Sequence, residues 1–189
     1  MYRYLPVLTA VMLTAACSSV PAPVTSPYYQ IPAGSKLVLK QTLTIPPNTA
    51  SVYIQYGKVV SPQQKDNFYA HCWFTSWYVR DQPQLIKPDT FTITHSQQFE
   101  DVVSRGQSHM LAMNGPVTGV YDGGPMALDY STVMYIHSDK QPAIRRFGCG
   151  YWENPDDAQH LTVAEMQKVL GSIARIELKK DKQGPVSAR

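Results

Sequence analysis

The 189-residue chain is 43% hydrophobic and 16% charged, and it contains 12 Tyr and 15 Pro. This composition predicts one globular domain built from strands and turns, and it argues against a helical bundle or a largely disordered chain. The formal net charge of +3 is too small to indicate nucleic-acid binding.

Residues 1–16 have the features of an export signal. Arg3 supplies an early positive charge, an apolar run follows from Leu5, and small residues end the segment. The apolar run is well short of the ~20 residues that a membrane-spanning helix needs. The pattern therefore predicts a cleaved signal peptide.

The end of this segment, Thr14-Ala15-Ala16-Cys17, resembles the lipobox of bacterial lipoproteins. The resemblance implies that Cys17 becomes the acylated N-terminus, typically carrying palmitate, and that Ser18 directs the protein to the outer membrane. Several acyl chains together hold a protein stably on a membrane. Most lipoboxes have Leu where this chain has Thr14, so cleavage by an ordinary signal peptidase, which leaves Cys17 free, is the alternative.

A Pro-rich segment, residues 17–34, is expected to be an extended, lipidated tether that precedes a β-rich periplasmic domain at residues 35–178. Within the domain, apolar and polar residues alternate over Ser35–Ile45, which predicts one half-buried strand. A second strand is expected at Ser51–Tyr56, followed by a polar loop at Ser61–Asn67.

Tyr69–Val79 is the most aromatic segment and is expected to form a strand. If Cys72 points into the core, alternation places Tyr69, His71, Trp73 and Trp77 on the opposite face. Exposed aromatic rings are typical of binding sites, so this face is a possible binding surface for a glycan, peptidoglycan or an envelope protein. The alternative is a strand buried on both sides and covered by the C-terminal helix.

Further strands are expected in the second half of the chain. They are Thr90–Thr94, Thr132–His137 and Ala143–Trp152, whereas Phe99–Val103 fits either a strand or a helical turn. Turns are expected at 114–116 and 122–125.

One helix is indicated near the end of the chain. Thr162 and Glu165 form a capping box, and Gly171 supplies the stop. A last strand is expected at Ile173–Leu178, and residues 179–189 are expected to form a frayed basic tail.

With Cys17 taken by lipid, Cys72 and Cys149 remain as a pair in an oxidising compartment, so a disulfide between them is expected. Closing a loop of this size contributes roughly 4 kcal/mol in the chain-entropy model. The less favoured alternative is a reactive thiol.

No chemical motif points to an enzyme, a metal site or a cofactor. The chain has no Cys-x-x-Cys, no P-loop, no Gly-x-Ser-x-Gly and no Gly-x-Gly-x-x-Gly, and its histidines are scattered. A hydrolase of envelope polymers is the alternative function, and it would require residues such as His71, His95, His137 and Asp129 to converge in a cleft.

These patterns predict a mainly β fold, an antiparallel sandwich or small barrel with one C-terminal α-helix. Beyond the lipobox, the domain is similar only in general character to uncharacterised proteobacterial lipoproteins. The leading hypothesis is a lipid-anchored protein on the periplasmic face of the outer membrane that serves as a structural, assembly or binding module of the cell envelope.

Overall fold

The computed structural model describes residues 22–103, 127–156 and 159–179. The expected signal peptide, Cys17, the turns at 114–116 and 122–125, and the tail beyond residue 179 lie outside these residues.

Strands dominate the described part of the chain, as the composition predicts. They are β1 (Lys36–Leu39), β2 (Leu43–Ile45), β3 (Ser51–Gln55), β4 (Lys58–Val60), β5 (His71–Ser76), β6 (Gln84–Ile86), β7 (Asp89–Val103), β8 (Ala127–His137), β9 (Ile144–Glu153) and β10 (Ala174–Glu177). The helix α1 (Val163–Leu170) precedes β10.

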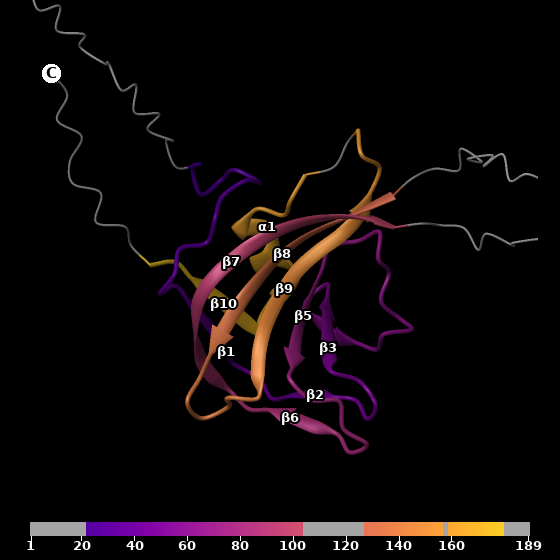
Figure 1. Ribbon diagram of the computed structural model, residues 1–189, viewed down its shortest axis with the longest axis vertical. Helices are drawn as coiled ribbons and strands as arrows, with labels where there is room; N and C mark the ends of the chain where they lie inside the picture. Colours follow the sequence, from indigo (N-terminus) through magenta and orange to yellow (C-terminus); the bar gives the residue numbers. More distant parts are fainter. Residues whose placement is uncertain (1–21, 104–126, 157–158, 180–189) are drawn as a thin grey trace, which may run out of the picture.

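The main sheet has eight antiparallel strands in the order β10-β1-β7-β8-β9-β5-β3-β4. Figure 1 shows that this sheet curls strongly, with α1 behind β8 and β9. The helix contacts β10 near one edge of the sheet and β3 and β5 near the other edge, so it lies inside the curl. The expectation of a mainly β antiparallel fold with one C-terminal helix is confirmed, and the sheet is a curled half-barrel.

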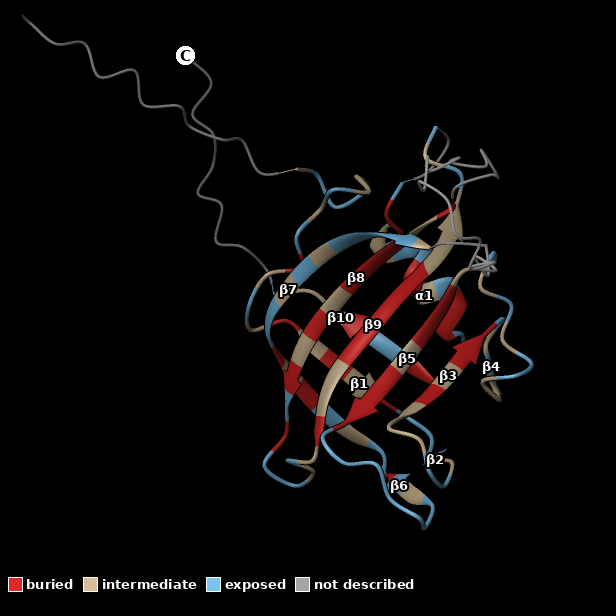
Figure 2. Ribbon diagram, turned by 45° about the vertical axis from the view of Figure 1, so that its right-hand side comes forward, coloured by how far each residue is buried: buried red, intermediate tan, exposed pale blue. Residues whose placement is uncertain are grey.

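The hydrophobic core fills the concave face, which we call the inner face. It contains alternate residues of the strands together with Met166, Val169 and Leu170 of α1. Phe74, Phe91 and Phe147 are its largest fully buried side chains. In Figure 2 the buried residues concentrate on β5, β8 and β9, whereas the upper part of β7 is largely exposed.

The helix begins and ends as its sequence predicts. Thr162 Oγ1 accepts a hydrogen bond from the backbone N–H of Glu165, and the Glu165 carboxylate accepts one from the Thr162 N–H. Gly171 has a φ of 55°, and a Cβ atom there would lie 3.0 Å from the Cα of Gly57 in the β3–β4 turn. Only glycine fits this contact between helix and turn.

The prediction of one strand over Ser35–Ile45 is wrong, because the segment divides into β1 and β2, which belong to different sheets. At the break, the Lys40 N–H donates to the carbonyl of Ile173. Leu37, Leu39, Leu43 and Ile45 are all buried nonetheless. The apolar alternation continues across the break, so the pattern alone does not reveal it.

The structure settles one open question from the sequence and departs from one prediction, that of the tether. Phe99–Val103 belongs to the long strand β7 and pairs with β8. Residues 22–34 of the expected tether include Ile31, which is buried in the core, and the Ser96 hydroxyl donates to its carbonyl. Part of that segment thus packs against β7.

The expected disulfide is confirmed. Cys72 of β5 and Cys149 of β9 are directly paired across the two strands and bonded, with an S–S distance of 2.09 Å. Both side chains are fully buried on the inner face. The bond therefore links neighbouring strands at the centre of the sheet.

Candidate functional site

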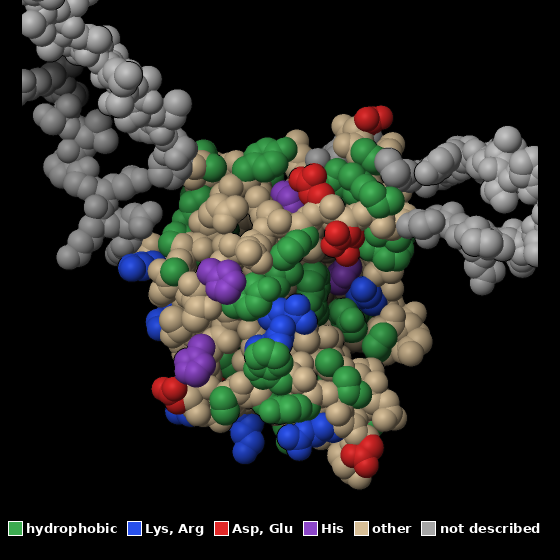
Figure 3. Space-filling view, in the orientation of Figure 1, with side chains coloured by type: hydrophobic (Ala, Val, Ile, Leu, Met, Phe, Trp, Pro, Cys, Tyr) green, Lys and Arg blue, Asp and Glu red, His purple; other side chains and the backbone are tan. Residues whose placement is uncertain are grey.

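The convex, outer face of the sheet carries a different set of residues on the same strands. Alternation from Cys72 and Phe74 places His71, Trp73 and Thr75 of β5 on this face. The ladder then places Tyr53 of β3 beside Trp73. Figure 3 looks onto the outer face, where basic, acidic and histidine side chains stand among apolar ones.

A groove of about 450 Å³ is hollowed into this face. Its lining includes aromatic, basic and acidic side chains: Tyr53, Lys65, His71, Trp73, Asp129 and Arg146. Strands β3, β5, β8 and β9 and the β4–β5 loop supply its lining, and it is open to solvent. We call it the outer groove.

Glycine at position 148 creates the floor of the outer groove. Gly148 of β9 is the ladder partner of Trp73, and a Cβ atom there would lie 2.3 Å from the Trp73 ring. The indole therefore lies against the backbone of β9, in the space that a larger residue would occupy.

One end of the outer groove is built around His71, which is 5% exposed. Its Nδ1 lies 3.0 Å from the carbonyl oxygen of Tyr69, and its Nε2 lies 3.3 Å from Nζ of Lys65. The carbonyl can only accept, so Nδ1 carries the proton, and the lone pair of Nε2 accepts from the ammonium. Burial, with the nearby Lys65 charge, lowers the pKa of His71 to about 4.

Lys65 and Asp129 complete this end. The Lys65 ammonium lies 4.6 Å from the centre of the Tyr53 ring, at cation–π distance. Burial lowers the pKa of Lys65, and the nearby Asp129 charge acts in the opposite direction by raising it. Burial raises the pKa of Asp129, which accepts a hydrogen bond from the Trp152 side chain. Shifted pKa values gathered in one concavity are typical of functional sites.

The other end of the outer groove contains Arg146 of β9 beside a hydrogen-bonded pair, Ser51 and Thr75, whose hydroxyls are 3.0 Å apart. Among the carboxylates that the structure describes, none lies within 4.0 Å of the charged groups of Lys65 or Arg146. The groove thus holds two cations that are not neutralised by direct ion pairs.

The four aromatic residues predicted to share a surface are divided in the structure. His71 and Trp73 line the outer groove. Tyr69 is 56% exposed and lines a separate apolar groove of about 470 Å³ with Tyr56 and α1. Trp77 is 60% exposed beyond the end of β5, with the Arg145 guanidinium 3.5 Å above its ring.

The residues named for a hydrolase are also divided. His71 and Asp129 line the outer groove together. His95 stacks on Tyr135 with ring centres 4.1 Å apart, and His137 lies 2.9 Å from Asp139. Neither His95 nor His137 lines the outer groove.

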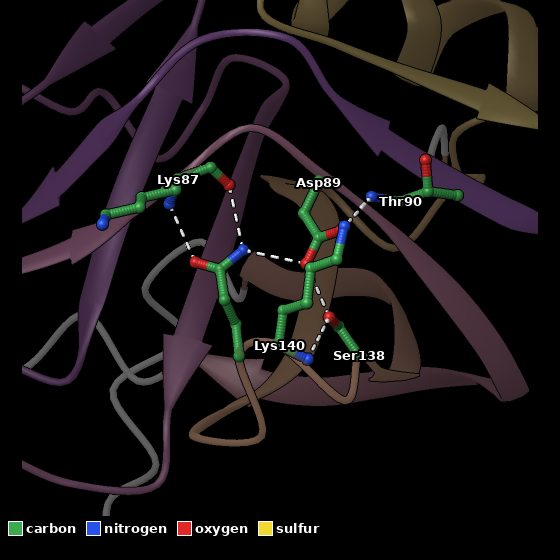
Figure 4. Close-up of polar contacts among 6 residues, drawn as sticks. Lys87, Asp89, Thr90, Ser138 and Lys140 are labelled. Atoms are coloured by element: carbon green, nitrogen blue, oxygen red, sulfur yellow. Dashed lines mark hydrogen bonds and ion pairs between the residues drawn. The ribbon is translucent and has the colours of Figure 1, made fainter.

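A second polar cluster surrounds Asp89, at the start of β7 (Figure 4). Its carboxylate is 7% exposed and accepts hydrogen bonds from the Ser138 hydroxyl (2.5 Å) and the Gln141 amide (3.1 Å). Burial opposes ionisation, but these bonds and one from the Thr90 N–H outweigh it and lower the pKa of Asp89. Asp89 therefore ties β7 to the β8–β9 turn and is structural.

Within the ranges that the structure describes, no three His, Cys, Asp or Glu side chains gather as potential metal ligands. No helix in those ranges has the length and hydropathy to cross a bilayer.

Sequence reasoning missed Tyr53, Lys65 and Arg146. Their positions depend on long-range strand pairing and on a loop, which spacing alone does not reveal. One signal was present: Gly148 and Gly150 flank Cys149, so both occupy the face opposite the core in an otherwise bulky strand. Glycines inside a strand often mark a place where another group approaches closely.

No known family model matches the chain, and no curated protein and no solved structure shows significant similarity to it.

Proposed function

We propose that the protein is a binding module of the bacterial cell envelope, held by lipid at Cys17 on the periplasmic face of the outer membrane, and that the outer groove is its binding site. The observation that carries this proposal is the groove itself. It combines the aromatic rings of Tyr53 and Trp73 with the charged groups of Lys65 and Arg146 in one open concavity.

A hydrogen-bonded frame supports the binding role. The His71 ring is held by Tyr69 on one side and by Lys65 on the other. The disulfide lies on the opposite face of the same strands and links them at the ladder pair next to Trp73 and Gly148. A preorganised site of this kind loses little entropy when a ligand binds.

Site-directed photocrosslinking in cells tests the role of the outer groove. A photoreactive residue at Val133, which lines the groove, is expected to give adducts with an envelope polymer or protein. The same residue at Leu85, exposed on β6 outside the groove, is the control. Equal adducts from both positions, or none from Val133, would contradict the proposal.

The lipid anchor has a separate test. Cys17→Ser is expected to move the protein from the membrane fraction to the soluble periplasmic fraction. If the variant stays with the membrane, the anchor is wrong, although the outer groove can still bind its ligand.

The enzyme alternative rests on His71 and Asp129 lying in one groove with shifted pKa values. A hydrolase needs a base with a free lone pair. Nε2 of His71 already accepts from Lys65, which leaves Asp129 as the one base of the pair that a hydrolase could use. We therefore favour binding. Incubation with isolated peptidoglycan decides between the two, because only a hydrolase releases soluble fragments and loses that activity in Asp129→Asn.

A further inference from the structure

We infer that the outer groove takes an acidic oligosaccharide, a short chain of sugars whose negative charges are carboxylates. This inference rests on the proposed function and names the ligand class for the same site. Three features carry it: the two cations, the indole between them, and the pairing of the surrounding strands.

The cations indicate a negatively charged ligand. Lys65 and Arg146 line the outer groove, and none of the described carboxylates lies within ion-pair distance of either. Lys65 donates to a neutral imidazole and lies over a ring, so no direct ion pair neutralises its charge, and the Asp129 charge acts on it only from beyond ion-pair distance. A planar guanidinium such as that of Arg146 pairs well with a carboxylate.

The strand positions beside the two cations indicate a chain of linked units rather than a small ion. His71, beside Lys65, and Thr75, the ladder partner of Arg146, are four positions apart on β5. A strand rises about 3.3 Å per residue, so these positions are roughly 13 Å apart. Trp73 lies midway, where its ring offers an apolar surface on which a sugar ring can stack.

The strand pairing disfavours an extended peptide as the ligand. β5, β8 and β9 of the floor are each paired on both sides within the sheet, and β3 pairs with β4 along residues 53–55. A peptide binding by strand addition needs a free strand edge, and the floor offers one only at residues 51–52 of β3, a stretch of two residues. A sugar chain requires only a ring surface and side-chain hydrogen bonds, which the groove supplies.

Asp129 favours carboxylates over phosphates. Its side chain lies in the same groove as Lys65 and would repel a doubly charged phosphate more strongly than a singly charged carboxylate. As a carboxylate it can also accept hydrogen bonds from sugar hydroxyls.

Titration followed by tryptophan fluorescence and calorimetry tests the inference, with trigalacturonate as the acidic probe. Maltotriose is the neutral sugar control, glucose 1-phosphate the phosphate control and triglutamate the acidic peptide control. Trigalacturonate is expected to bind most tightly, and its affinity is expected to fall with added salt.

Two charge variants and one matched control make the test specific. Arg146→Gln and Lys65→Gln are each expected to weaken trigalacturonate binding about tenfold or more, since each removes a charged hydrogen-bond donor. Arg145→Gln removes the neighbouring arginine, which lies over Trp77, and is expected to leave affinity unchanged. Lys65→Arg keeps the charge and should retain most of the affinity. Thermal unfolding checks that each variant is folded.

The outcomes separate this inference from the proposed function. Equal or tighter binding of any control probe, or equal losses in Arg145→Gln and Arg146→Gln, overturns the acidic sugar ligand. If no probe binds but Val133 still crosslinks to an envelope component, the ligand class is wrong and the binding module stands. If there is neither binding nor crosslinking, both fail.

Discussion

The two faces of β5 and β9 have opposite chemistry although they share one backbone. The inner face presents Cys72 and Phe74, both fully buried in the core. The outer face presents His71 and Trp73, which alternate with them along the strand and line the outer groove. Because successive side chains of a strand point to opposite faces, a stable core and the proposed binding surface are built from adjacent residues.

The comparison indicates a division of roles. Inner-face residues bury apolar surface and are expected to determine the free energy of unfolding. Outer-face residues include titratable groups whose burial opposes their charge, which costs stability and is typical of sites retained for function. The four predictions below test how far the two roles separate.

The largest expected effect comes from the inner face. Replacing both cysteines, Cys72→Ala with Cys149→Ala, removes a bond that closes 77 residues. The free energy of unfolding is expected to fall by roughly 4 kcal/mol, because the unfolded chain gains conformational entropy. Alanine avoids burying an unpaired hydroxyl. Chemical denaturation measures the loss.

The affinity of the double cysteine variant for the ligand is the second measurement for this prediction. The β5–β9 hydrogen bonds keep the strands in register without the disulfide, so the folded double variant should bind trigalacturonate nearly as tightly as the wild type. A large loss of affinity with little loss of stability would contradict the division of roles.

The next effect is a pH dependence that originates on the outer face. The pKa of His71 is about 4 in the folded protein, against 6.5 for an unperturbed histidine. Between these values the unfolded chain binds a proton that the folded protein does not, so stability falls as the pH drops from 6.5 to about 4. The full loss is at most about 3 kcal/mol.

Denaturation of the wild type and of His71→Gln across this pH range measures that contribution. Burial also lowers the pKa of His160, so some pH dependence is expected to remain in the variant. An unchanged slope in His71→Gln would show that His71 is not buried in its neutral form.

A smaller effect is expected at the floor of the outer groove. In Gly148→Ala the new methyl group occupies the position of the Trp73 ring, so the ring must move. Overpacking of this kind costs about 1–3 kcal/mol, and the loss of the stacking surface should abolish ligand binding. Denaturation and tryptophan emission report the two effects.

A second variant tests the cause. Adding Trp73→Leu to Gly148→Ala relieves the clash and should recover stability but not binding. If Gly148→Ala alone leaves stability and emission unchanged, the close contact between Trp73 and β9 is wrong.

The sequence predicts the inner face far better than the outer one. The capping box at Thr162 and the Cys72–Cys149 pair could be recognised because caps are local and because two thiols in the compartment expected from the sequence have few alternatives. The outer groove needed Tyr53, Lys65 and Arg146 to come together from β3, a loop and β9. Strand order determines that arrangement, and no local pattern specifies strand order.

The smallest effect is expected at the N-terminus of α1, which packs on the inner face only. It therefore tests whether a change on the inner face leaves the outer groove unaffected. Thr162→Ala removes the side-chain acceptor for the Glu165 N–H, and losing such a cap costs about 1 kcal/mol. Thr162→Ser keeps the hydroxyl and is the matched control. Since α1 packs against the face opposite the outer groove, stability should fall while trigalacturonate affinity stays unchanged. A fall in affinity of tenfold or more in Thr162→Ala would mean that the curl of the sheet couples its two faces, because α1 contacts β5, which carries both Phe74 and Trp73.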